Sequence, residues 1–407
     1  MATGTRELPA TPDDSQFGRS GSPGRPIGDW AFAGVAIASI GGPLAIAGLI
    51  APAITGDTLQ SGGLATLVSL VVFLAPLGVW LRWSGEVSGA GGLYGFVEAA
   101  AGRRVALVQA AIWTFSYLLY IVYTTTQIVY DLLPQVIPGE RGWQTPLSLL
   151  IPIAIVGVMV AGRTAALVTL GLLAAGQVAF AGVLDGVAVG HLGLPVSSFG
   201  TGAGAGEVLQ SGAKTSLLYV CAGLPLFLGG ELKRPAQTIR RGLSGAYVLT
   251  GALVLLAVAP LAAAPALAHT EVPGAAVLAR YEGGGAGHAI GIAIAASVGG
   301  VILAEYVALT RLLSAAGRWP VRKVTLAVGA FVLAAAPLML IDPGGIYDAL
   351  TRPSLIALWL SQLIVFAVYP RFAHRRGQAM APAWTLSAVA CAFAVHGLWN
   401  AVHQLGS

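Results

Sequence analysis

The chain has 407 residues, of which 56% are hydrophobic and only 10% are charged, and its formal net charge is +5. Soluble domains carry roughly a quarter charged residues, so this composition excludes a soluble globular protein and indicates several membrane-spanning helices. The sequence pI of about 9.4 does not indicate nucleic-acid binding. The Lys and Arg residues lie in short loops between apolar segments and do not form one basic face.

The first 28 residues are rich in Pro, Gly, Ser and Thr and show no apolar periodicity. They are predicted to form a disordered cytoplasmic tail, residues 1–28, ahead of a single transmembrane domain over residues 29–403. The tail lacks the apolar core and the small-residue cleavage site of a signal peptide.

Eleven apolar spans follow the tail, and a helix of about 20 such residues crosses a bilayer. The spans begin near Trp30, Leu64, Val105, Leu147, Ala165, Ser216, Ala246, Ala289, Val324, Ile346 and Trp384. If the N-terminus is inside, the cytoplasmic segments hold all of the 22 Lys and Arg residues except Arg141, Lys214, Arg280 and Arg352. Cytoplasmic loops carry such an excess. The sequence therefore predicts about eleven helices, with the N-terminus inside and the C-terminus outside, in the cell membrane of a bacterium.

The first and sixth spans are each interrupted near their centres by glycine and proline. The first contains Ile40-Gly41-Gly42-Pro43, and the sixth contains Cys221-Ala222-Gly223-Leu224-Pro225. Such breaks free backbone N–H and C=O groups, which is tolerable inside a membrane only where they line a cavity or bind a ligand. Interruptions at matching places in two halves of a chain indicate the binding site of a secondary transporter. The alternative is a helix-packing face of small residues.

Motifs after three of the spans resemble those of a known group of proteins. The run Ser88–Tyr94 resembles the signature P-x-G-G-x-Y, Gly230–Pro235 resembles E-x-K-N-P, and Thr310–Pro320 resembles a conserved S-R-x-x run that ends in G-x-x-P. Ile40-Gly41-Gly42 lies where the same group has an I-G-x-G break. In this order and on these sides of the membrane, the motifs resemble the amino acid–polyamine–organocation (APC) superfamily of permeases. The resemblance implies an all-α fold of two inverted five-helix repeats with broken helices one and six, here with an eleventh helix.

The resemblance also implies where a substrate binds. The free N–H groups of Ile40, Gly41 and Gly42 would hold a carboxylate, because the N-terminus of a half-helix carries partial positive charge. Carbonyl groups near the sixth-span break would hold an ammonium group, and the third span would line the pocket. The predicted substrate-binding residues are Ser39, Ile40, Gly41, Gly42, Ser116, Tyr120, Tyr219, Cys221, Ala222 and Gly223.

Two acidic residues lie inside apolar spans. Glu305 lies about one turn inward of the middle of the eighth span, where an ionisable group is costly and is by default a functional hypothesis. It is predicted to be a proton-coupling carboxylate, and the alternative is a structural partner for a backbone group or for Arg311. Asp185 is close to the outer end of the fifth span, where its side chain is expected to reach toward the membrane surface.

These features predict a secondary active transporter that moves a small, neutral amino acid by alternating access, either coupled to protons or as an exchanger. Two alternatives stay open: transport of a polyamine or organic cation, and a non-transporting amino-acid receptor or sensor of the same fold. No His, Cys, Asp or Glu cluster has metal-ligand spacing, and no Ser lies in a nucleophile motif. The protein is therefore not expected to bind a metal or a cofactor or to be an enzyme. The oligomeric state is not predicted.

Overall fold

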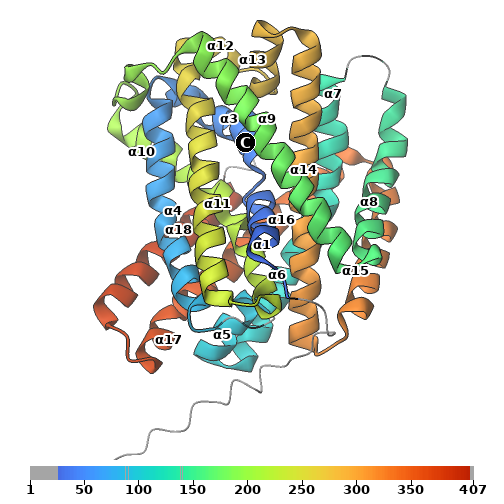
Figure 1. Cartoon of the computed structure of the whole chain (residues 1–407), viewed down its shortest axis with the longest axis vertical. Coiled ribbons are helices and arrows are strands. Elements are labelled where there is room, and N and C mark those ends of the chain that lie inside the picture. The colour runs from blue at the N-terminus through green and yellow to red at the C-terminus, as the bar shows by residue number, and fades with distance from the viewer. Residues whose placement is uncertain (1–25, 88, 90, 138, 140, 404–407) are drawn as a thin grey trace, which may run out of the picture.

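A computed structural model describes residues 26–87, 89, 91–137, 139 and 141–403. Helices make up this part of the chain almost throughout, and one isolated bridge between Ile27 and Leu232 is its only strand-like pairing. Helices satisfy the backbone hydrogen bonds within each segment, as the interior of a bilayer requires. The prediction of an all-α membrane protein is confirmed (Figure 1).

Within the described ranges, ten helical segments are long and apolar enough to cross a membrane. The first, Asp29–Ser84, has 56 residues and contains two of the eleven predicted spans. Its path turns at the 3₁₀-helix η3 (Gly56–Ser61), where Thr58 leaves helical geometry, and α4 (Gly62–Ser84) then runs back toward the end where α1 (Asp29–Ser39) begins (Figure 1). Each of the other nine segments contains one predicted span.

The remaining elements follow in chain order. The first half continues with α2 (Pro43–Ala45), η2 (Ile46–Ile50) and α3 (Ala51–Thr55) before η3, and with α5 (Leu93–Ala101), α6 (Arg103–Thr126), η4 (Gln127–Leu132), α7 (Leu133–Val136), η5 (Arg141–Trp143), α8 (Gln144–Ala161) and α9 (Arg163–Leu192) after α4. The second half holds η6 (Val196–Phe199), α10 (Ala205–Ser216), η7 (Leu217–Glu231), α11 (Pro235–Val258), η8 (Ala259–Ala263), α12 (Pro265–Ala268), α13 (Pro273–Tyr281), α14 (Gly284–Gly317), α15 (Val321–Ala335), η9 (Ala336–Leu340), α16 (Pro343–Ala367), α17 (Tyr369–Arg375) and α18 (Met380–His403).

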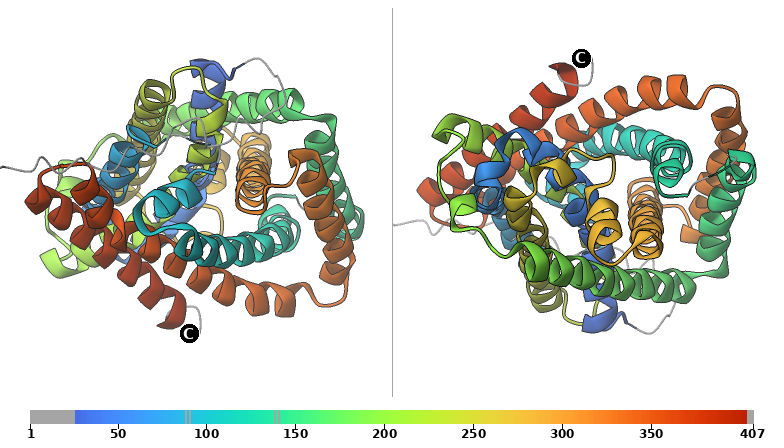
Figure 2. Two further views of the ribbon diagram at one scale, coloured as in Figure 1. Left: turned by 90° about the horizontal axis from the view of Figure 1, so that it is seen from below. Right: turned by 90° about the horizontal axis from the view of Figure 1, so that it is seen from above.

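The centre of the molecule is formed by four elements that pack on one another. α1 contacts both η7 and α14, and α14 also contacts α6. The segments Ala205–Glu231 and Gly284–Gly317 are the most enclosed, with 78% of their most apolar stretch buried, against 22% for Arg141–Ala161. Seen from both ends, α14 lies inside an outer layer to which α9 and α15 belong (Figure 2). The break in helix one is therefore placed in the middle of the fold.

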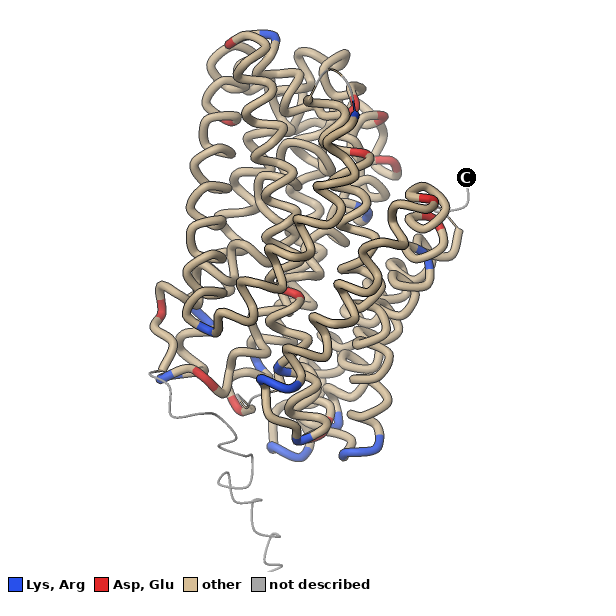
Figure 3. Tube along the Cα trace, turned by 90° about the vertical axis from the view of Figure 1, so that its right-hand side faces the viewer, with Lys and Arg blue, Asp and Glu red and all other residues tan. Residues whose placement is uncertain are grey.

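Lys and Arg residues gather at one end of the molecule (Figure 3), the end at which α5 and α17 lie in Figure 1. The positive-inside rule predicts that such an end faces the cytoplasm, and it is called the cytoplasmic end below. Most of the tail predicted as disordered lies outside the described residues, as do Ser88 and Ala90 of the glycine-rich motif. Residues 26–28 are described, and there Ile27 is buried and its N–H donates to the carbonyl of Glu231.

Candidate functional site

Helix one is broken at the predicted place. α1 ends at Ser39, α2 begins at Pro43, and Gly41 and Gly42 between them have φ angles of 62° and 70°. Only glycine adopts such angles without strain. Space requires glycine as well: a Cβ on Gly41 would lie 2.8 Å from the carbonyl oxygen of Leu218, and one on Gly42 would lie 2.5 Å from the Ser297 hydroxyl oxygen. The break therefore packs closely between η7 and α14.

Of the three N–H groups predicted to be free at this break, those of Ile40 and Gly41 are hydrogen-bonded. The N–H of Ile40 donates to the Ala36 carbonyl at 3.2 Å, and that of Gly41 donates to the Ser39 carbonyl at 2.7 Å. Ile40 has φ −70° and ψ 64°, so the latter bond closes an inverse γ-turn, which uses the donor expected to be free. Among the described groups, the N–H of Gly42 and that of Leu44 find no acceptor. These two donors mark the positive end of the second half of helix one.

The first half of the same helix ends with free acceptors. Its last carbonyl groups lack the N–H partners that a continuous helix would supply, and Gly41 bonds to Ser39 in place of Ile37. The carbonyls of Ile37 and Ala38 therefore receive no hydrogen bond from the described residues. The Ser39 hydroxyl donates back to the Ala36 carbonyl at 3.1 Å, so its proton is used within the same helix end. Unpaired donors and unpaired acceptors thus lie on the two sides of one break.

Helix six changes its type where a break was expected. Regular α-helix ends at Ser216, and a 15-residue 3₁₀-helix, η7, runs through Gly223 and Pro225 to Glu231. Runs of 3₁₀-helix longer than three or four residues are uncommon and often mark functional or strained segments. Most carbonyls of η7 are bonded within it, but Pro225 has no N–H to give to the carbonyl of Ala222. The interruption therefore begins at Leu217, ahead of the predicted position.

The residues predicted on η7 point in different directions. Cys221 is buried and lies against the hydroxyl of Tyr117 on α6. Tyr219 packs instead against Phe73 and Tyr247, on the side of α4 and α11. Ala222 and Gly223 are buried, and a Cβ on Gly223 would make ordinary contact with the Trp80 ring at 3.4 Å. Cys221 is thus the η7 side chain that the structure joins to the third span.

On α6, the structure separates the two predicted residues. Tyr120 stands in a row of aromatic rings, 6.1 Å from the Tyr117 ring and 5.0 Å from the Tyr123 ring, measured between centroids. Ser116 faces α16 instead: its hydroxyl donates to the Ser354 carbonyl, and the Ser354 hydroxyl donates to the Ser116 carbonyl, both at 2.8 Å. Ser116 is placed as a link between two helices, and Tyr120 remains with the candidate site.

Glu305 is the central charged group of the candidate site. It has no exposed surface, and neither carboxyl oxygen has a hydrogen-bond partner among the described residues. The hydroxyls of Tyr117, Tyr120 and Tyr123 and the Cys221 thiol are within electrostatic range of it. A charged carboxylate without donors is costly in such surroundings, so this group needs a proton or another cation.

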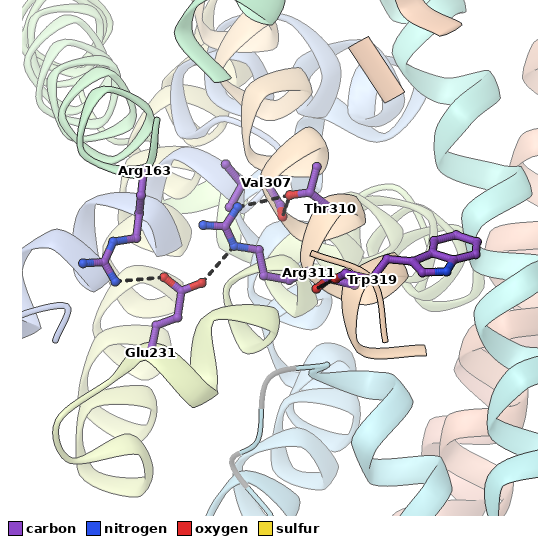
Figure 4. A network of polar contacts seen from close by, with 7 residues as sticks. Arg163, Glu231, Val307, Thr310, Arg311 and Trp319 are labelled. Carbon is purple, nitrogen blue, oxygen red and sulfur yellow. Dashed lines mark hydrogen bonds and ion pairs between the residues drawn. The ribbon is translucent and has the colours of Figure 1, made fainter. Parts of the chain in front are cut away.

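The alternative role for Glu305, as a partner of Arg311, is wrong. Arg311 donates to the carboxylate of Glu231 at 2.9 Å, at the cytoplasmic end of η7, and Arg163 of α9 donates to the same carboxylate at 3.3 Å (Figure 4). Because the Glu231 carbonyl also accepts from Ile27, this one residue ties together η7, α14, α9 and the chain ahead of α1. These contacts join four elements at the cytoplasmic end of the bundle.

Two side chains that contact predicted residues were not themselves predicted to bind substrate. Ser297 on α14 accepts from the N–H of Ala45 at 3.4 Å and touches Gly42, and Tyr117 meets Cys221. A signal for Ser297 was present, because it lies eight residues before Glu305, and positions eight apart fall on the same face of a helix. Tyr117 precedes Tyr120 by three residues, which is the same kind of signal.

Solved transporters share this fold. The chain is similar to MhsT, solved in complex with L-phenylalanine, with a TM-score of 0.59 at 14% identity over 93% of this chain and 99% of that one. It is also similar to a substrate-bound, outward-open Na⁺-coupled sialic acid symporter, with a TM-score of 0.57 at 14% identity over 92% of this chain and 90% of that one. No protein-family model and no curated protein sequence matches the chain. At these identities the likeness shows the fold alone, a LeuT-like transporter fold.

Proposed function

We propose that this multi-pass membrane protein is a secondary active transporter that moves a small, neutral amino acid across the membrane by alternating access. The substrate would bind at the break in helix one, between η7, α6 and α14. The shared fold with two solved transporters supports transport as the general function. The sequence motifs support the narrower assignment to the APC superfamily of permeases.

The observation that carries the proposal is the pairing of free donors and free acceptors at the break. The N–H groups of Gly42 and Leu44 stand at a positive helix end, which suits a carboxylate. The carbonyls of Ile37 and Ala38 stand at a negative helix end, which suits an ammonium group. A carboxylate and an ammonium group are common to all amino acids. The predicted η7 residue that meets α6 at the site is Cys221, a small side chain, which favours a small and uncharged substrate side chain.

The coupling ion is proposed to be a proton on Glu305. This carboxyl is fully buried and has no donor in the described structure, so protonation removes the cost of its charge. Loss of the proton on one side of the membrane would then favour the conformation that opens there. Exchange of one amino acid for another remains the alternative without net proton movement.

A cationic amine is the second candidate substrate, and Glu305 is the specific observation that favours it. An ammonium group could take the place of the proton and form an ion pair with the unpaired carboxylate. A receptor or sensor of the same fold would bind the same ligands without moving them.

The test has two stages on purified protein. Thermal unfolding is first measured with each of the twenty amino acids and with common polyamines, because a ligand present at 100 times its Kd stabilises the folded state by about 2.7 kcal/mol. Uptake of each stabilising compound is then measured in liposomes under a proton gradient, with Na⁺ replaced by choline in a parallel set. Stabilisation and proton-driven uptake of neutral amino acids are expected. Binding without flux would identify a receptor, and stabilisation by polyamines alone would identify an amine transporter.

A further inference from the structure

A large cavity opens at the cytoplasmic end of the bundle, away from the candidate substrate site. Its volume is about 910 Å³, and it lies between the last turns of α4, the first turns of α11 and the connection from α17 to α18. Its polar wall consists of Arg82, Glu86, Gln237, Arg240, Arg241 and Gln378. Neither the helix-one break nor Glu305 contributes to it.

The charge of this cavity is strongly positive. Among the described residues, no carboxylate lies within ion-pair distance of Arg82, Arg240 or Arg241. The acidic residue in the wall, Glu86, forms an exposed ion pair with the guanidinium of Arg376 at 3.7 Å. Three guanidinium groups around one cavity suit a phosphate, because each can donate two parallel hydrogen bonds to phosphate oxygens. In the orientation that satisfies its hydrogen bonds, the Gln237 side-chain oxygen accepts from the Arg241 guanidinium at 3.0 and 3.2 Å and holds it at the cavity wall.

The surface next to the cavity, on the side of the bilayer centre, is apolar and open. On α4, Val71 and Leu74 are 66% and 53% exposed, on the helix face that continues through Gly78 to Arg82. On α11, Val248 is 68% exposed, two turns from Arg241 on the same face. On α4 this face is crossed at Gly78 by Leu386 of α18, so the exposed path from the arginines toward the middle of the membrane, called here the apolar stripe, runs along α11 to Val248.

The cavity also lies at the depth of lipid headgroups. Trp384, in the first turns of α18, is 60% exposed, and exposed tryptophans mark the interface between membrane and water. Above this level α18 closes onto α4, because a Cβ on Gly78 would be 3.3 Å from the Leu386 side chain. Basic pockets between helices on the cytoplasmic side of a membrane bind anionic lipid headgroups.

We propose that this cavity binds an anionic phospholipid of the cytoplasmic leaflet. The phosphate would lie among Arg82, Arg240 and Arg241, and the acyl chains would cover the apolar stripe. The bound lipid would join α4, α11 and α18, which meet at this place. The proposal is independent of which solute the protein transports.

The test compares two triple variants of the full-length protein, purified in an uncharged detergent. In the cavity variant, Arg82→Gln, Arg240→Gln and Arg241→Gln remove three charges. The matched control removes three charges from the same face outside the cavity, by Arg318→Gln, Arg322→Gln and Lys323→Gln. Binding of phosphatidylglycerol and of phosphatidylcholine is measured by native mass spectrometry. Phosphatidylglycerol should bind the cavity variant roughly 100-fold more weakly than wild type, since each basic residue near the surface contributes several-fold in affinity. The control should bind like wild type.

Three outcomes would overturn the proposal. Binding of phosphatidylcholine as strong as that of phosphatidylglycerol would show that the cavity does not select the charge of the headgroup. An equal loss in the control variant would show that the whole basic face attracts lipid without a defined site. Displacement of the lipid by glycerol phosphate or inorganic phosphate at matching concentrations would assign the cavity to a free anion. Should the triple variant fail to fold, the single variants Arg82→Gln and Arg240→Gln are measured in the same way, each expected to weaken binding about five-fold.

Discussion

Replacing Gly42 by alanine tests the geometry of the helix-one break. The residue has φ 70°, where a side chain costs about 1–2 kcal/mol. The new Cβ would lie 2.5 Å from the Ser297 hydroxyl oxygen and 3.1 Å from the Ser297 carbonyl oxygen. Overpacking of this kind costs about 1–3 kcal/mol, and the stiffer unfolded chain returns about 0.4–1 kcal/mol. A net loss of about 1–5 kcal/mol in the free energy of unfolding is expected.

The assay is the thermal midpoint of Gly42→Ala in detergent, measured beside Gly299→Ala. Gly299 lies on α14 two residues from Ser297, and a Cβ there would meet no atom within 4 Å, so this control should melt at or above the wild-type midpoint. Adding Ser297→Ala to Gly42→Ala should recover part of the loss, because the closest clash is with the serine oxygen. If Gly42→Ala melts at the wild-type temperature, the described geometry of the break is incorrect.

Three further changes test the other groups of the site. Glu305→Gln should abolish proton-driven accumulation in liposomes while sparing exchange, and unchanged uphill uptake would remove Glu305 from the coupling mechanism. Glu231→Gln leaves Arg311, which is 8% exposed, without its carboxylate partner and should cost about 1–3 kcal/mol of stability. The control Glu282→Gln breaks the half-exposed pair with His191, which is worth about 0–1 kcal/mol. Equal thermal midpoints of the two variants would contradict the role of the cytoplasmic network. Ser116→Ala should lower the free energy of unfolding by about 1 kcal/mol for the lost bond to Ser354, and with it the thermal midpoint, without changing ligand affinity. A ten-fold weaker ligand Kd would return Ser116 to the binding site.

How far the sequence predicted the site depends on the range of the interaction concerned. The break at Gly41 and Gly42 was predictable because glycine followed by proline at membrane depth is a local signal. Which N–H groups stay free was not, because the inverse γ-turn at Ile40 depends on how the two half-helices are held by η7 and α14. The continuous 3₁₀ geometry of η7 was also missed, since the same Gly-x-Pro pattern fits a break and a tightened helix.

The sequence by itself determined the membrane class, the positions of the spans and the gathering of positive charge at one end. These follow from local composition and from the length of chain that a bilayer demands. Only the tertiary structure decided which polar groups meet. It turned Ser116 toward α16, paired Arg311 with Glu231 and left Glu305 without a partner among the described residues. The contact between Ser116 and Ser354 joins residues 238 positions apart, and contacts of this kind depend on the rotation and packing of whole helices, which no short stretch of sequence fixes.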